Sequence, residues 1–515
     1  MPLYKLPQTL YSVALKLTEI LVETACINIE SWYGNFDVDL CKFQVNSLNR
    51  YLSCNLSSTV LDDLCEHRSV VKHSLRRDNR IRLAIHLHRN MRKFSVDVAM
   101  TKCKFPIEDP FWIDHLSRLP FITSLDLHLI CTDEILEVIG RFCPLLEEIN
   151  IVSRLEQDKR AKACSFNALK LKFFVSDEGL SYLSNCKKLK KLTMNKMLRS
   201  HYVGRMMTDN GIRKLLRALS NLQFISYGDT GSVIAHGMEG ISALNLQGLS
   251  DVHPSPIHID AAARLCPRLQ CLSLSMPTGN VSQVSDGRDG NEEGGMVLQA
   301  LSRSSINVTG LELNQFKFEE TLLNLLKVKG DHITNLDLNT SNAMSSKDII
   351  SIGRNCPSIQ GLCVKNMGPE PASVKVHPWH KSPSFDSKIP PFSCLQGLQL
   401  NGQDWNPEII LGLCLSYAFH LKTLSLQNFS YLNLLDKIMS RIFFINPMRE
   451  LIALYLYVGC PLSFNGILQV LENCPKINQL TFLEHEFLQS EDVALLKEEV
   501  QKNNFDLNIC SLGVN

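Results

Sequence analysis

Short stretches in which leucine or isoleucine alternates with polar residues recur along most of this chain. The clearest is Asn355-Cys-Pro-Ser-Ile-Gln-Gly-Leu-Cys-Val364, and related stretches keep its cysteine and its apolar spacing. The related stretches begin at Phe142, Asn185, Leu265 and Asn473. Shorter copies without the Cys-Pro pair cover 121–127, 221–227, 308–313, 333–338, 395–400, 421–426 and 451–456. The alternation predicts β-strands with one buried face, and its recurrence predicts a solenoid of stacked repeats.

An apolar helix is predicted between one alternating stretch and the next. Its opening recurs in one form, with a hydroxyl or carboxylate side chain that can accept from free backbone N–H groups. These openings are Thr132-Asp133-Glu134-Ile135, Ser176-Asp177-Glu178-Gly179-Leu180, Thr208-Asp209-Asn210-Gly211-Ile212 and Ser346-Lys347-Asp348-Ile349. Equivalent leucines, such as Leu311 and Leu336, are about 25 residues apart, within the range of leucine-rich repeats.

The combined pattern, Cys-Pro-x-Leu-x-x-Leu-x-Leu followed by a Thr/Ser-Asp-x-Gly-Leu step, resembles the cysteine-containing subtype of leucine-rich repeat. The resemblance covers roughly residues 115 to 485. It implies an α/β solenoid with parallel strands on the concave face and helices on the convex face. A small thiol fits at the helix end where a larger group would push adjacent repeats apart, and the proline ends the helix. The repeat-defining cysteines are Cys143, Cys186, Cys266, Cys356 and Cys474.

Four segments follow from these patterns. Residues 1–78 are predicted to form a small all-α module, with helices from Thr9 to Gly34, over 43–52 and over 59–77. Residues 79–115 form a basic connector with a first atypical strand at 94–98, and 116–485 form the solenoid. Residues 486–515 form a C-terminal cap. Glycine- and proline-rich insertions at 277–295 and 368–391 are expected to be long loops.

The composition is that of an ordinary soluble globular protein, with 45% hydrophobic and 20% charged residues. Lys and Arg number 53 and Asp and Glu 52, and this balance argues against a general nucleic-acid or membrane-surface binder. The start lacks a signal-peptide pattern, and no apolar run is long enough to span a membrane. The 18 cysteines form no Cys-x-x-Cys pair, which favours buried free thiols in a reducing compartment. We expect a cytoplasmic or nuclear protein.

No pattern indicates catalysis. The chain has no phosphate-binding loop, no His-Glu-x-x-His and no Gly-x-Ser-x-Gly elbow, and His377 and His380 lack a further metal ligand beside them. The helix-opening aspartates are predicted to cap helices, being too far apart to act as a catalytic pair. We therefore expect no enzyme, no cofactor and no metal. The basic stretch from Lys72 to Lys93 is interpreted as a solvated cap in preference to a surface for an anionic partner.

Repeats of this subtype most often occur in substrate receptors of cullin-RING ubiquitin ligases, which carry a helical adaptor-binding module at the N-terminus. Thr9-Leu10-Tyr-Ser-Val-Ala14 is similar to an elongin-binding box, and Leu21-Val-Glu-Thr-Ala25 offers a second register. The i, i+4 spacing places each leucine and alanine on one helix face, together with Leu17. In both registers alanine stands where the family more often has cysteine. The resemblance implies elongin B/C and a cullin as partners, with a substrate protein on the repeats.

Two alternatives remain for the N-terminal residues. Leu6-Pro7 and Trp32 resemble the ends of an F-box, which would bind another adaptor, but 12–30 continue as one helix where an F-box is usually broken. The elongin interpretation is therefore favoured. The helix could also serve only to cover the first repeat, which would make the chain a leucine-rich-repeat scaffold without a ligase link.

Overall fold

The computed structural model describes most of the chain from Leu87 onward, in two compact units. The described residues are 87, 89–95, 109–127, 131–151, 175–194, 207–277, 290–368, 390–402, 406–428, 435–457, 462–483, 494–496, 498–500 and 507–512. The N-terminal unit runs to Asp251 and includes 264–268, and the C-terminal unit comprises 252–263 and the residues from Leu269. The predicted helical module at 1–78 lies outside the described residues.

The N-terminal unit is a regular alternation of strands and helices. In chain order its elements are β1 (Lys93–Ser95), α5 (Asp109–Leu116), β2 (Ser124–Asp126), α6 (Asp133–Phe142), β3 (Glu148–Asn150), α7 (Asp177–Leu183), β4 (Lys191–Thr193), α8 (Asp209–Ala218), β5 (Phe224–Ser226), α9 (Thr230–Ala235) and β6 (Gly248–Asp251). Each strand pairs in parallel with the next, so chain order and sheet order agree.

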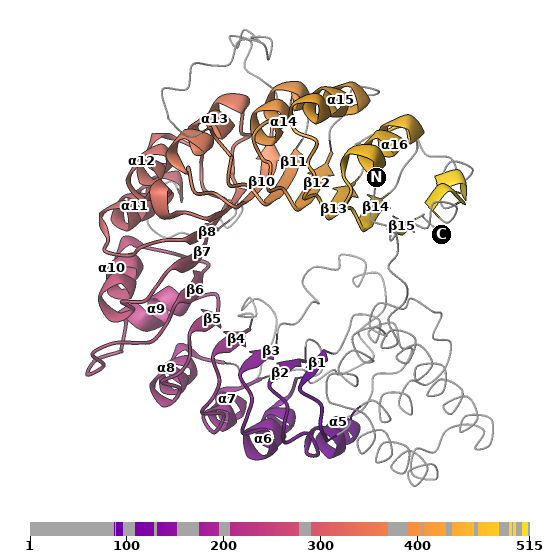
Figure 1. The fold of residues 1–515 in the computed structure, drawn as a ribbon. Helices are drawn as coiled ribbons and strands as arrows, with labels where there is room; N and C mark the ends of the chain where they lie inside the picture. Colours follow the sequence, from indigo (N-terminus) through magenta and orange to yellow (C-terminus); the bar gives the residue numbers. More distant parts are fainter. Residues whose placement is uncertain are drawn as a thin grey trace, which may run out of the picture. The chain divides into compact units, whose positions relative to one another are not determined.

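The C-terminal unit follows the same plan after α10 (Pro256–Leu265). Its elements are β7 (Cys271–Ser275), α11 (Gly290–Arg303), β8 (Gly310–Asn314), α12 (Glu320–Lys329), a 3-10 turn (Gly330–His332), β9 (Asn335–Asn339), α13 (Ser346–Asn355), β10 (Gly361–Met367), β11 (Gly397–Gly402), α14 (Pro407–Leu415), β12 (Thr423–Gln427), α15 (Leu435–Ile445), β13 (Ala453–Leu456), α16 (Phe464–Asn473), β14 (Gln479–Leu483) and β15 (Asn508–Leu512). Its strands also pair in parallel in chain order. In each unit the helices lie on one side of the strands (Figure 1).

The strand leucines build the core. Leu336, Leu362, Leu398 and Leu424 occupy one register row on successive strands, and each is at most 2% exposed. Burying one such side chain contributes roughly 1.5–3 kcal/mol. The intervening strand residues face away from this core because successive side chains alternate. The predicted α/β leucine-rich-repeat solenoid is confirmed for the described residues.

Four features of the fold differ from the prediction, namely two helix starts and two strands. Helix α11 begins at Gly290, so 290–295 are not part of the expected loop; acidic Glu292 and Glu293 in its first turn favour a helix start there. Strand β6 belongs to a repeat that was not predicted, because none of the alternating stretches found in the sequence covers 248–251. Strand β15 pairs with β14, so the sheet continues into the predicted C-terminal cap. Helix α13 is capped by Ser345, one residue before the expected opening.

Candidate protein-interaction surfaces

The repeat-defining cysteines are buried in the turns that connect each helix to the next strand. All five are at most 1% exposed, and Cys143, Cys356 and Cys474 each cap the C-terminus of a helix. The Cys143 Sγ lies 3.9 Å from the Leu116 carbonyl, and the Cys186 Sγ lies 3.9 Å from the Cys143 carbonyl. Burial raises the pKa of Cys143 to about 12 and that of Cys186 to about 11. The thiols therefore stay protonated and join successive repeats.

Three aspartates bind the start of the following repeat instead of capping their own helix. Asp133 Oδ1 accepts from Ser176 N at 2.8 Å, and its Oδ2 accepts from Ser176 Oγ at 2.5 Å. Asp177 accepts in the same way from Thr208, and Asp436 Oδ1 accepts from Ser463 N at 3.1 Å. The predicted self-capping role of Asp133 and Asp177 is a misassignment, because Thr132 and Ser176 cap those helices. Asp348 fits the prediction, in a capping box with Ser345, whereas α8 is capped by Thr208 and Asp209 accepts from the Tyr227 hydroxyl at 3.2 Å.

These bonds explain the glycine of the Asp-x-Gly-Leu step. A Cβ on Gly211 would lie 2.1 Å from the Asp177 Oδ1, and one on Gly179 would lie 2.0 Å from the Asp133 Oδ1. Gly466 has the same relation to Asp436. Only glycine leaves room for the carboxylate of the preceding repeat. The aspartate and the glycine therefore act together as one motif that connects adjacent repeats.

The C-terminal unit presents an ordered polar surface, which we call the strand face. It consists of the side chains on β7 to β14 that point away from the leucine core. Its middle row is Ser273, Glu312, Asp337, Cys363, Gln399, Ser425, Tyr455 and Thr481, each in register with the next. A row of polar side chains at strand spacing can contact a protein partner across several repeats.

The charges of the strand face lie together on β8, β9 and β10. Glu312 is opposite Asp337, the Lys365 Nζ donates to Asp337 Oδ2 at 2.8 Å, and Asn314 Nδ2 donates to Glu312 Oε1 at 3.0 Å. Partial burial acts to lower the pKa of Lys365, but its bond to Asp337 outweighs this and the pKa lies above its ordinary value. Burial first, and then Asp337, raises the pKa of Cys363 to about 12. Cys363 is therefore a neutral thiol, suited to contact and not to nucleophilic attack.

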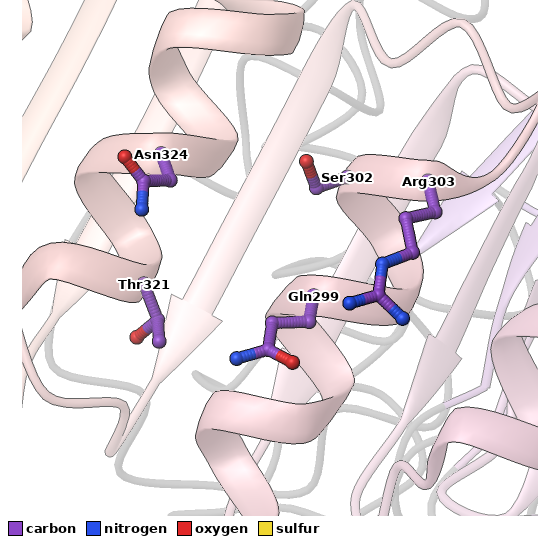
Figure 2. A pocket seen from close by; sticks show the side chains of 5 residues that line it. All are labelled: Gln299, Ser302, Arg303, Thr321 and Asn324. Carbon is purple, nitrogen blue, oxygen red and sulfur yellow. The ribbon is translucent and has the colours of Figure 1, made fainter.

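A polar hollow lies between α11 and α12 on the helical side of the same unit. Gln299, Ser302 and Arg303 enter it from α11, and Thr321 and Asn324 enter it from α12 (Figure 2). Its volume is about 270 Å³. Asn324 also accepts from Lys327 Nζ at 3.3 Å. The hollow is open to solvent, and its lining offers polar contacts to the surface of a protein partner.

The predicted adaptor-binding residues, namely Thr9, Leu10, Ala14, Leu17, Leu21 and Ala25, lie outside the described residues. Within the described ranges, no group of three or more His, Cys, Asp or Glu side chains is placed to hold a metal ion. None of the described helices has the length and apolarity needed to cross a bilayer.

Comparison with known proteins gives matches to solved structures alone. No family model and no curated protein matches the chain. It is similar to the crystal structure of the Rad7–Elc1 complex in yeast, with 15% identity, a TM-score of 0.42 and coverage of 95% of this chain and 96% of that one. It is also similar to the leucine-rich-repeat-containing protein LegL7 from Legionella pneumophila, with 13% identity, a TM-score of 0.29 and coverage of 80% and 97%.

Proposed function

We propose that the protein is the non-catalytic substrate-recognition subunit of a cullin-RING ubiquitin ligase, active in the cytoplasm or nucleus. The strand face would hold the substrate protein, and the helix predicted from Thr9 to Gly34 would bind elongin B/C. In this assignment the chain carries no chemistry of its own and brings the substrate to the ligase.

The strand face is the observation that supports the recognition role. Seven of the eight residues in its middle row are at least partly exposed, and Thr481 is the buried one, whereas the leucines beside the row are buried. The cysteine-type repeats and the Leu10/Ala14 and Leu21/Ala25 spacing support the ligase link. A helix with a leucine stripe can place its leucines in a groove of an adaptor.

The adaptor link can be tested by affinity purification of the tagged full-length chain from cells. The wild type should recover elongin C and a cullin, and the double variant Leu10→Asp/Leu21→Asp should lose both. Lys16→Asp is the matched control, because helical spacing places Lys16 away from the leucine stripe. If the wild type recovers neither elongin C nor an F-box adaptor, the ligase assignment is wrong and a scaffold function remains.

The substrate role needs a second pair of variants. Gln399→Arg with Ser425→Arg places two large cations in register on adjacent strands of the strand face. We expect this variant to lose co-purifying substrate proteins while it keeps elongin C. Asn465→Arg, at an exposed position of α16, is the control. An unchanged set of co-purifying proteins in the strand-face variant would contradict substrate binding there.

A further inference from the structure

The turns that lead into strands β1 to β5 of the N-terminal unit form one continuous edge. Their last residues are linked by backbone bonds: Thr123 N donates to Arg92 O at 2.7 Å, Glu147 N to Thr123 O at 2.8 Å, and Lys190 N to Glu147 O at 2.7 Å. In the same way, Gln223 N donates to Lys190 O at 2.8 Å. The thiol contacts of Cys143 and Cys186 stack the same turns on one another. Side chains on these turns therefore belong to one surface.

This edge is strongly basic. The five turns, 89–92, 117–123, 141–147, 184–190 and 217–223, carry eight bases and one acid, Glu147. The bases are Arg89, Arg92, Arg118, Arg141, Lys187, Lys188, Lys190 and Arg217, and all of them are exposed. We call these eight residues the basic edge. The balanced charge of the whole chain conceals this local excess.

Four of the eight bases form no ion pair with a described carboxylate. Arg118 pairs with Asp114, and Lys190 pairs with Glu147. Arg141 and Lys188 form no ion pair within the described part of the chain. Lys187 Nζ donates to Ala218 O at 3.3 Å and Arg217 Nη2 donates to Gly237 O at 2.9 Å, and neither bond cancels a charge.

The excess is not a general property of such turns. The helix dipole favours basic side chains near the C-terminus of any helix, so the turn after each helix could carry basic residues for this reason alone. The equivalent turns of the C-terminal unit hold a sparser set, which is partly cancelled. Its charged members are Arg303, Lys329, Asp331, Arg354, Lys422, Arg449, Glu450, Glu472 and Lys476. Because these turns carry fewer bases per turn and three acids, helix-end compensation alone does not account for the density in the N-terminal unit.

Two exposed aromatic rings lie within the basic edge. The Arg92 guanidinium is 6.0 Å from the centroid of the Phe121 ring, and that of Arg141 is 5.3 Å from the centroid of Phe142. Phe121 is 37% exposed and Phe142 is 38% exposed. The surface therefore combines positive charge with apolar contact area, which an acidic polypeptide with apolar side chains matches and the sugar-phosphate backbone of a duplex does not. These features favour a polypeptide over a nucleic acid.

We propose that the basic edge is a docking surface for an acidic polypeptide segment that also carries apolar side chains. Its carboxylates would lie against Arg141, Lys187 and Lys188, and its apolar side chains against Phe121 and Phe142. Charge complementarity of this kind increases the association rate and selects partners by sign. The surface is separate from the strand face, and its occupation does not depend on a ubiquitin-ligase role.

The test measures binding of labelled peptides to the full-length chain by fluorescence anisotropy. The probes are an 18-residue repeat of Asp-Glu-Phe, the matching repeat of Asp-Glu-Gly, and a 20-base-pair DNA duplex. We expect the phenylalanine peptide to bind best, and Arg141→Gln/Lys188→Gln to weaken it roughly tenfold, because two contacts are lost. Lys347→Gln/Lys437→Gln removes two exposed helix lysines of the C-terminal unit and should leave binding unchanged. Circular dichroism checks that both variants fold.

Each other result overturns the proposal. Equal binding of the phenylalanine peptide to the wild type and to Arg141→Gln/Lys188→Gln would show that the basic edge is not the site. Failure of the wild type to bind this peptide would show that no such site exists. Tighter binding of the duplex, lost in the same variant, would show that the partner is a nucleic acid. Equal binding of the two peptides would exclude a role for Phe121 and Phe142.

Discussion

The carboxylate of Asp177 holds the first residue of the next repeat, since its Oδ1 accepts from Thr208 N at 2.7 Å and its Oδ2 accepts from Thr208 Oγ1 at 2.6 Å. Thr208 in turn accepts from Gly211 N at 3.3 Å and caps α8. One carboxylate therefore fixes both the position of α8 and its cap. The stability of the joint between two repeats depends on this contact.

Asp177→Asn should destabilise the protein by about 1–3 kcal/mol, because the amide nitrogen cannot accept from Thr208 and one donor loses its partner. The measurement is urea denaturation followed by circular dichroism. Glu134→Gln, an exposed carboxylate in the first turn of α6, is the control and should change stability by less than about 0.5 kcal/mol. Equal stability of Asp177→Asn and wild type would mean that the bond contributes nothing to the joint.

Gly211→Ala should also destabilise the protein, although alanine is the better helix former by about 1 kcal/mol. The new Cβ would lie 2.1 Å from the Asp177 Oδ1, so the carboxylate must move and its bonds to Thr208 weaken. Gly295→Ala is the matched control in α11, because its Cβ would meet only the Thr321 Cγ2 at 3.7 Å. We expect thermal melting to shift downward for Gly211→Ala and slightly upward for Gly295→Ala. A gain in both would contradict the steric argument.

Stability should fall as pH rises above about 9, because of the buried thiols. Burial raises the pKa of Cys356 from 9.0 to about 12, so the folded state keeps a proton that the unfolded state loses. The stabilisation is present below pH 9 and is lost between pH 9 and 12, at about 1.4 kcal/mol per pH unit for each thiol. Urea midpoints at pH 8, 9 and 10 measure the slope. Cys356→Ala should be less stable at pH 8 and show a smaller slope, and an unchanged slope would exclude thiol titration as the cause.

Asn446→Ala should lower the free energy of unfolding by about 2–3 kcal/mol, because the Asn446 residue is 1% exposed and both its amide nitrogen and its amide oxygen form hydrogen bonds. Its Nδ2 donates to Leu415 O at 2.7 Å in the preceding repeat, and its Oδ1 accepts from Met448 N at 3.0 Å. Asn473→Ala is the control, since the Asn473 side chain donates to Gln469 O within its own helix and has no bond to another repeat among the described residues. The measurement is urea denaturation. Equal losses of stability in the two variants would show that the bond between repeats stabilises the protein no more than a bond within one helix.

The strands and helices could be predicted from sequence, whereas the joints between them could not. Leu336 and Leu338 alternate with polar neighbours, so a strand with a buried face follows from local spacing alone. The bond from Asp133 to Ser176 spans 43 positions, and nothing near either residue indicates the other. Helix capping is the usual role of an aspartate at a helix start, so the prediction followed the local rule and missed the partner in the next repeat.

The candidate surfaces were largely hidden from sequence for a similar reason. The stretch from Lys72 to Lys93 contains Arg89 and Arg92 of the basic edge, but local sequence favoured a solvated cap there over a surface for an anionic partner. The basic residues from Arg89 to Arg92 and from Lys187 to Lys190 are about 100 positions apart, and whole-chain charge cancels them. Only the stacking of turns brings them to one edge. The strand face likewise could not be predicted from sequence, because the register between strands such as β8 and β9 decides which polar residues are neighbours.

The aspartate joints have a direction, and it is the direction of protein synthesis. In each of the three, the acceptor is made first and the residue that it holds is made later: Asp133 before Ser176, Asp177 before Thr208, and Asp436 before Ser463. Each of these helix caps is therefore held from the N-terminal side. Removal of repeats from the C-terminal end takes away none of the three carboxylates from the caps that remain.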